Sequence, residues 1–123
     1  MSNKKKVLII DDDNRNIFAL TAVLKARGYN CLSAAGGAEG LQVLKEQKDV
    51  AVVLMDMMMP DMDGYEAIAV MNAHPELKDI PVIAVTAQAM LGDKERCLEA
   101  GAVGYVSKPI NVDNLTDLLT KYI

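Results

Sequence analysis

The chain has 123 residues, of which 51% are hydrophobic and 24% are charged, as expected for one globular domain with one core. Its formal net charge is −4, and the short basic run at residues 4–6 is too small to neutralise a series of nucleic-acid phosphates. No apolar run approaches the ~18 residues of a membrane span, and Cys31 and Cys97 form no metal-ligand spacing. We therefore expect a single cytoplasmic domain over residues 1–123, with no membrane span and no direct contact with nucleic acid.

Short apolar runs alternate with amphipathic helical patterns along the chain. Val7–Ile10 is rich in β-branched residues, and the next segment places Ile17, Leu20 and Leu24 at helical spacing before Gly28. Residues 50–55 form a continuous apolar run, which is typical of a central strand covered on both faces. The pattern predicts strands at 7–10, 29–34, 50–55, 80–85 and 103–106, and helices at 14–27, 38–47, 64–73, 92–100 and 112–122.

Five strand–helix units in succession predict an α/β fold with a doubly wound, five-stranded parallel sheet. Parallel neighbours need crossover connections, and right-handed crossovers place helices on both faces of the sheet. In such sheets the ligand site lies beyond the carboxyl ends of the strands, where the strand order reverses. The polar residues that follow the strands are therefore the candidates for chemistry.

Polar side chains follow four of the five predicted strands. They are Asp11, Asp12 and Asp13 after the first strand, Asp56 after the third, Thr86 after the fourth and Lys108 after the fifth. Carboxylates gathered at ~5 Å repel one another by roughly 3 kcal/mol per pair at an effective dielectric of ~20, so the site must raise a pKa or bind a cation. Hard oxygen ligands favour Mg²⁺, and a carboxylate can also attack phosphorus. The pattern alone does not choose the nucleophile, and Asp13 by itself is more typical of a helix N-cap.

The sequence resembles the receiver domain of two-component response regulators. The resemblance rests on "VLIIDDDNRN", "VLMDMMMPDMDG", "VIAVTA" and "YVSKPI", which occur in the family's order at the predicted strand ends. It implies a flavodoxin-like sheet of strand order 2-1-3-4-5. It also implies that Asp56 is the phosphoacceptor, and that Asp12, Asp56 and the backbone carbonyl of Met58 bind Mg²⁺ or Mn²⁺ directly. Asp11 is then similar to the acid that holds the metal through water.

Further roles follow from the same resemblance. Lys108 is similar to the lysine that pairs with a phosphoryl oxygen, and Pro109 to the proline of a cis bond that aims this lysine. Thr86 resembles the switch hydroxyl, and Tyr105 the aromatic residue that moves inward with it. Gln88 lies two residues beyond Thr86, where the family tunes hydrolysis of the acyl phosphate.

The resemblance implies a phosphorylation-activated signalling switch that is not a turnover enzyme. A histidine kinase or a histidine phosphotransfer protein donates the phosphoryl group, and the domain assists its own phosphorylation and slow dephosphorylation. The face made by the fourth helix, fifth strand and fifth helix then changes shape and meets a downstream protein. We expect a monomer or a weak, phosphorylation-dependent dimer.

Two alternatives stand beside this interpretation. Asp11 as nucleophile and Asp13 as acid–base would resemble the haloacid dehalogenase phosphatases, but that reading leaves Asp56 without a role. After Lys108 only Asp113 and Asp117 remain as acids, and both fall in the last predicted helix. The other alternative is a degenerate receiver that only binds partners, which the complete set of acidic, hydroxyl and amine residues disfavours.

Overall fold

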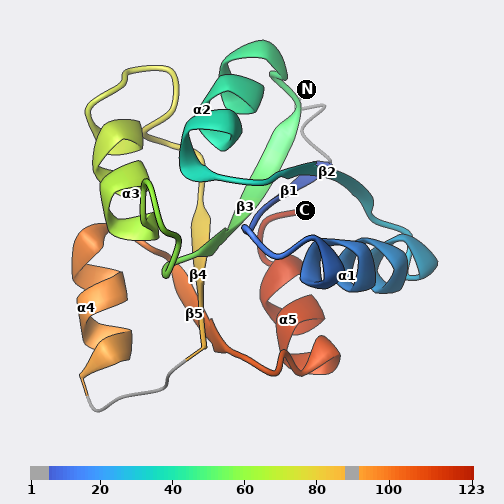
Figure 1. Ribbon diagram of the computed structural model, residues 1–123. Coiled ribbons are helices and arrows are strands. Elements are labelled where there is room, and N and C mark those ends of the chain that lie inside the picture. Colours follow the sequence, from blue (N-terminus) through green and yellow to red (C-terminus); the bar gives the residue numbers. More distant parts are fainter. Residues whose placement is uncertain (1–5, 88–91) are drawn as a thin grey trace.

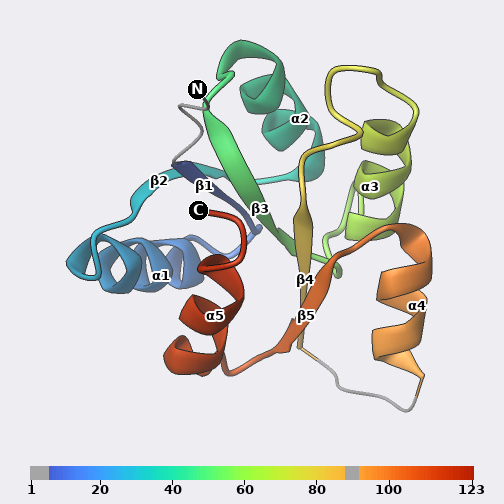
Figure 2. The ribbon, with the colours of Figure 1, turned by 180° about the vertical axis from the view of Figure 1, so that it is seen from behind.

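The computed structural model describes residues 6–87 and 92–123, and these form one five-stranded parallel sheet between two layers of helices (Figures 1 and 2). The strand order is β2-β1-β3-β4-β5, which confirms the predicted topology. The strands are β1 (Lys6–Ile10), β2 (Asn30–Ala34), β3 (Val50–Asp56), β4 (Val82–Thr86) and β5 (Gly104–Ser107). The helices are α1 (Asn14–Ala26), α2 (Gly37–Glu46), α3 (Gly64–Asn72), α4 (Asp93–Ala100) and α5 (Val112–Leu119).

Each face of the sheet carries its own hydrophobic core. Helices α1 and α5 cover one face, and α2, α3 and α4 cover the other (Figure 2). Alternate residues of β1 point to opposite sides, so Leu8 and Ile10 pack under α2 and α3, whereas Val7 and Ile9 pack under α1 and α5. All seven residues of β3 are buried, as its continuous apolar run predicts for a central strand.

The helix ends carry the signals expected from the sequence. Asp13 caps α1, because its side chain accepts a hydrogen bond from the amide of Arg15 at 2.9 Å. Gly28 follows α1 with φ of 94°, and its amide donates to the carbonyl of Lys25 at 3.0 Å. The N-cap prediction for Asp13 and the stop at Gly28 are therefore confirmed.

Two element boundaries differ clearly from the sequence prediction. β4 begins at Val82 and not at residue 80, because Pro81 has no amide proton to donate to the ladder, although its carbonyl accepts from Val53 at 2.9 Å. α5 ends at Leu119 and not at residue 122. There the hydroxyl of Thr120 donates to the carbonyl of Asp117 at 2.7 Å, at the helix C-cap.

None of the helices in the described residues is long and apolar enough to cross a membrane.

Candidate functional site

Three carboxylates gather at the carboxyl edge of the sheet. β1 and β3 are hydrogen-bonded neighbours with Ile10 opposite Met55, so Asp11, just after β1, lies beside Asp56, the last residue of β3. Asp11, Asp12 and Asp56 each place one oxygen within 4.8 Å of the other two. Asp11 is 2% exposed and Asp56 is 4% exposed, whereas Asp12 faces solvent. The structure thus brings together the three aspartates that the sequence analysis singled out as metal ligands.

Both oxygens of Asp11 accept hydrogen bonds. Oδ1 accepts the amide of Asp13 at 2.9 Å, and Oδ2 accepts the Asn16 side-chain amide at 2.5 Å and Nζ of Lys108 at 3.1 Å. Burial alone would raise the pKa of Asp11, but these three donors together hold it below its usual value. Asp11 is therefore a fixed, ionised carboxylate in the floor of the site.

Asp56 has fewer partners than Asp11. Its Oδ1 accepts the amide of Met58 at 3.1 Å, and its Oδ2 lies 3.6 Å from Nζ of Lys108. Burial, together with the neighbouring charge of Asp11, raises the pKa of Asp56 to about 6, against the opposing effects of the Met58 amide and Lys108. Of the two buried carboxylates, Asp56 is the one whose charge is poorly compensated.

Lys108 enters the site from the segment after β5. Its amide donates to the carbonyl of Thr86 at 2.7 Å, and the Lys108–Pro109 peptide bond is cis. The side chain is 23% exposed and Nζ reaches both Asp11 and Asp56. Burial would lower the pKa of Lys108, but the two carboxylates outweigh it and raise the pKa. One ammonium thus faces a group of three carboxylates.

The two predicted switch residues lie on neighbouring strands. Thr86 ends β4, is 3% exposed and stands opposite Ser107 of β5. Tyr105 of β5 is half-buried, and its hydroxyl donates to Oδ2 of Asp93, the first residue of α4, at 3.3 Å. Gln88 lies outside the described residues.

The carboxylate cluster fits a hard divalent cation. Its donors are oxygens only, and its three negative charges exceed the single charge of Lys108. Met58 is 62% exposed. Its backbone amide donates to Asp56, so the backbone of the loop after β3 runs beside the cluster. Asp11, Asp12 and Asp56 are the residues that would hold the ion.

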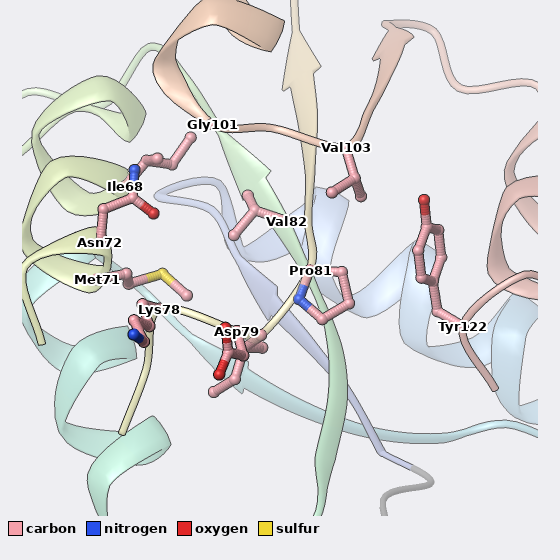
Figure 3. A pocket seen from close by; sticks show the side chains of 11 residues that line it. Ile68, Met71, Asn72, Lys78, Asp79, Pro81, Val82, Gly101, Val103 and Tyr122 are labelled. Carbon is pink, nitrogen blue, oxygen red and sulfur yellow. The ribbon is translucent and has the colours of Figure 1, made fainter. Parts of the chain in front are cut away.

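Of two hollows on the molecule, the first lies away from this site and the second borders it. A cavity of about 330 Å³ lies near the amino ends of β4 and β5, where Ile68, Val82 and Val103 form its apolar lining (Figure 3). None of the candidate residues at the carboxyl edge lines it. A smaller hollow of about 160 Å³, between the loops after β2 and β3, does border Asp12.

Sequence reasoning missed two polar residues that contact the predicted set. Asn16 binds Asp11, and Asp93 binds Tyr105. Asn16 lies in the first turn of α1, five positions after Asp11, and only this placement directly after a strand-end aspartate hints at a role. Asp93 stands in a mixed charged run, which gives no comparable signal.

Comparison with known proteins identifies the class. The family model described as response regulator receiver domain matches residues 7–120, so the chain belongs to this family. Receiver domains are the phosphorylation-dependent switches of two-component signalling, and this assignment places the chain in that class and not among the dehalogenase-like phosphatases. The single domain over residues 1–123 stays a prediction.

Similar proteins include regulators and receiver domains of several bacteria. The polar-differentiation response regulator DivK of Brucella anthropi is 35% identical over 119 residues, which cover 97% of this chain and 96% of DivK. A response regulator receiver protein from Pseudomonas putida superposes with a TM-score of 0.90 at 26% identity, covering 98% and 99% of the two chains. The receiver domain of a sensor histidine kinase from Pseudomonas aeruginosa, solved with a magnesium ion coordinated in its active-site cleft, is 31% identical with a TM-score of 0.86, covering 96% of each chain.

Proposed function

We propose that Asp56 accepts a phosphoryl group from a phosphohistidine of a histidine kinase or histidine phosphotransfer protein, in a reaction that requires Mg²⁺ or Mn²⁺. The observation that carries this proposal is the unequal pairing of the two buried carboxylates. Asp11 has a donor on each oxygen, including Asn16 and Lys108, whereas Asp56 Oδ2 has only the more distant Lys108 at 3.6 Å. Asp56 is therefore the buried carboxylate with the more weakly paired oxygen, which is the better placed of the two to react.

The transfer exchanges one bond for another. An ionised oxygen of Asp56 attacks phosphorus, the P–N bond of the phosphohistidine breaks, and the imidazole leaves with the bonding electrons and takes a proton. A divalent cation bound by the three aspartates would neutralise charge on the carboxylates and on the phosphoryl oxygens. Nζ of Lys108, which already lies between Asp11 and Asp56, would pair with one phosphoryl oxygen.

A protein donor has a surface to bind beside this site. Phe18, on α1 close after the acidic cluster, is 78% exposed, and the remaining exposed positions of α1 include Ala19 and Ala22. No acidic residue lies in α1, although the chain as a whole has a net charge of −4. An exposed aromatic side chain among small residues is typical of an interface anchor. We propose that the donor contacts this side of α1.

Phosphorylation would be reported through β4, which lies next to the strand of Asp56, and through β5 beyond it. The phosphoryl group brings ~−2 charge and three acceptor oxygens, which attract the Thr86 hydroxyl and Lys108. Tyr105 would then leave Asp93 and turn inward, and the α4-β5-α5 face would change its shape for a downstream protein. In this proposal Pro109 aims Lys108, Gln88 tunes hydrolysis, and the domain acts in the cytoplasm as a monomer or a weak, phosphorylation-dependent dimer.

The test is transfer from a purified donor whose histidine carries labelled phosphate. We expect about one label per chain, no transfer in EDTA, and no label on Asp56→Asn. Asp79→Asn, an exposed acid at the opposite edge of the molecule, is the matched control and should be labelled like the wild type. Many turnovers on excess donor, or unchanged labelling of Asp56→Asn, would contradict the proposal.

A further inference from the structure

Asn16 lies in the first turn of α1. Within the described residues, its side chain is joined to the site by one hydrogen bond, to Asp11. Its side-chain amide donates to Oδ2 of Asp11 at 2.5 Å, and Nζ of Lys108 donates to this same oxygen at 3.1 Å. Asp11 is 2% exposed, and its Oδ1 is already bound by the amide of Asp13. Two side chains thus share one buried carboxylate oxygen.

This shared oxygen matters because the Lys108 ammonium pairs with both Asp11 and Asp56. Nζ lies 3.1 Å from Asp11 and 3.6 Å from Asp56, so in the unphosphorylated chain it is closer to Asp11. A phosphoryl group on Asp56 adds charge on the other side and draws Nζ away from Asp11. If Lys108 were the only side-chain donor to Oδ2 of Asp11, its departure would leave this buried oxygen without a side-chain hydrogen bond and carry a desolvation cost.

We propose that Asn16 is a positioning residue that keeps Oδ2 of Asp11 hydrogen-bonded when Lys108 moves to the phosphoryl group. This inference rests on the proposed function and adds a residue to the same site. With Asn16 in place, Asp11 retains one donor on each oxygen after Lys108 moves. Without Asn16, Lys108 becomes the only side-chain partner of Oδ2 and is held on Asp11.

Removing the Asn16 side chain should lower the affinity of the site for a phosphoryl group, and this loss should require Lys108. Beryllium fluoride is a suitable probe, because it forms a phosphoryl-like adduct on a carboxylate. At saturating Mg²⁺, Asn16→Ala should weaken its binding about tenfold, which is the order of one lost hydrogen bond to a charged group. Asn14→Ala, an exposed asparagine at the start of the same helix, should bind like the wild type.

A double-mutant cycle separates this role from a structural one. In a Lys108→Ala background no ammonium is held on Asp11, so adding Asn16→Ala should change beryllium fluoride affinity less than about twofold. An equal loss in both backgrounds would show that Asn16 acts through the fold or the metal, and would overturn the inference. No loss in the wild-type background would overturn it as well.

A second measurement needs no Lys108 variant. The NMR signals of the Asn16 carboxamide should stay in slow exchange with solvent both before and after beryllium fluoride is added, because its bond to Asp11 persists. Loss of that protection on binding would contradict the inference. If the wild type itself forms no adduct, the proposed function fails and this inference fails with it, whereas a normal wild type with an unaffected Asn16→Ala sinks the inference alone.

Discussion

Replacing Asp56 by asparagine should stabilise the fold in the absence of divalent cations. Burial of the Asp56 carboxylate and the charge of Asp11 raise its pKa from 3.8 to about 6. That difference, at about 1.36 kcal/mol per pH unit, corresponds to about 3 kcal/mol lost when the ionised form is held in the folded chain. Allowing for water at the rim of the site, we expect Asp56→Asn to gain about 2 kcal/mol at pH 7.5, or roughly 5–10 °C in Tm.

The sign of this effect fixes its pH dependence. Below pH 3.8 Asp56 is protonated in both the folded and the unfolded chain, so it does not change the free energy of unfolding. Between pH 3.8 and about 6 Asp56 ionises first in the unfolded chain, so the wild type loses stability as pH rises. Above about 6 the loss is complete. The gain in Asp56→Asn should therefore fall to about one third at pH 4.5, and Mg²⁺ should shrink it at pH 7.5 by stabilising the wild type.

Urea unfolding followed by circular dichroism at both pH values measures the difference, with Asp79→Asn as an exposed control that should change little. A destabilised Asp56→Asn at pH 7.5 would contradict this prediction. A gain of equal size at pH 4.5 and 7.5 would also refute it, because an effect of charge must vanish as the carboxyl group is protonated.

Three further predictions follow from single contacts. Phe18→Ala should slow transfer from a phosphohistidine protein by tenfold or more while leaving labelling by acetyl phosphate unchanged; equal loss with both donors would exclude a docking role. Gly64→Ala should destabilise the fold by about 1–3 kcal/mol, because its Cβ would lie 2.8 Å from Cα of Met57. Gly36→Ala is the control, because a Cβ at this position meets open space and should destabilise the fold less. Similar melting temperatures for both variants would contradict this prediction. Tyr105→Phe removes the hydrogen bond to Asp93 and should increase the population of molecules in which the ring points inward. The NMR signals of the ring should then shift toward those of the beryllium fluoride adduct. Signals that do not move would contradict the idea that Asp93 holds Tyr105 outward.

The sheet and its acidic edge could be predicted because they depend on repeating patterns. Continuous apolar runs such as Val50–Met55 indicate buried parallel strands, and parallel strands bring their carboxyl ends to one edge whatever the loops do. Asp11 and Asp56 were therefore expected on the same edge of the sheet, and their direct proximity follows from the pairing of β1 with β3. The resemblance to receiver domains added the strand order and the choice of Asp56 as acceptor, neither of which follows from periodicity.

Contacts that depend on one side chain's direction could not be predicted in the same way. Asn16 and Asn14 are alike in the sequence, and only the packing of α1 shows that Asn16 turns toward Asp11 while Asn14 faces solvent. The hydrogen bond from Tyr105 to Asp93 joins β5 to a helix whose only buried residue is Cys97, so no hydrophobic pattern sets its position. The start of β4 at Val82 is different, because the missing amide proton of Pro81 is a signal that the sequence contains and that the apolar pattern alone does not take into account.

The most direct test of the phosphoacceptor is to locate the acyl phosphate chemically in the wild-type protein. After transfer from a phosphohistidine donor, borohydride reduces an aspartyl phosphate to homoserine, and peptide mass spectrometry then identifies the position. We predict homoserine at position 56 alone, in amounts that follow the fraction of chain labelled. Homoserine at position 11 or 12, with none at 56, would contradict the assignment of Asp56 as the carboxylate that reacts.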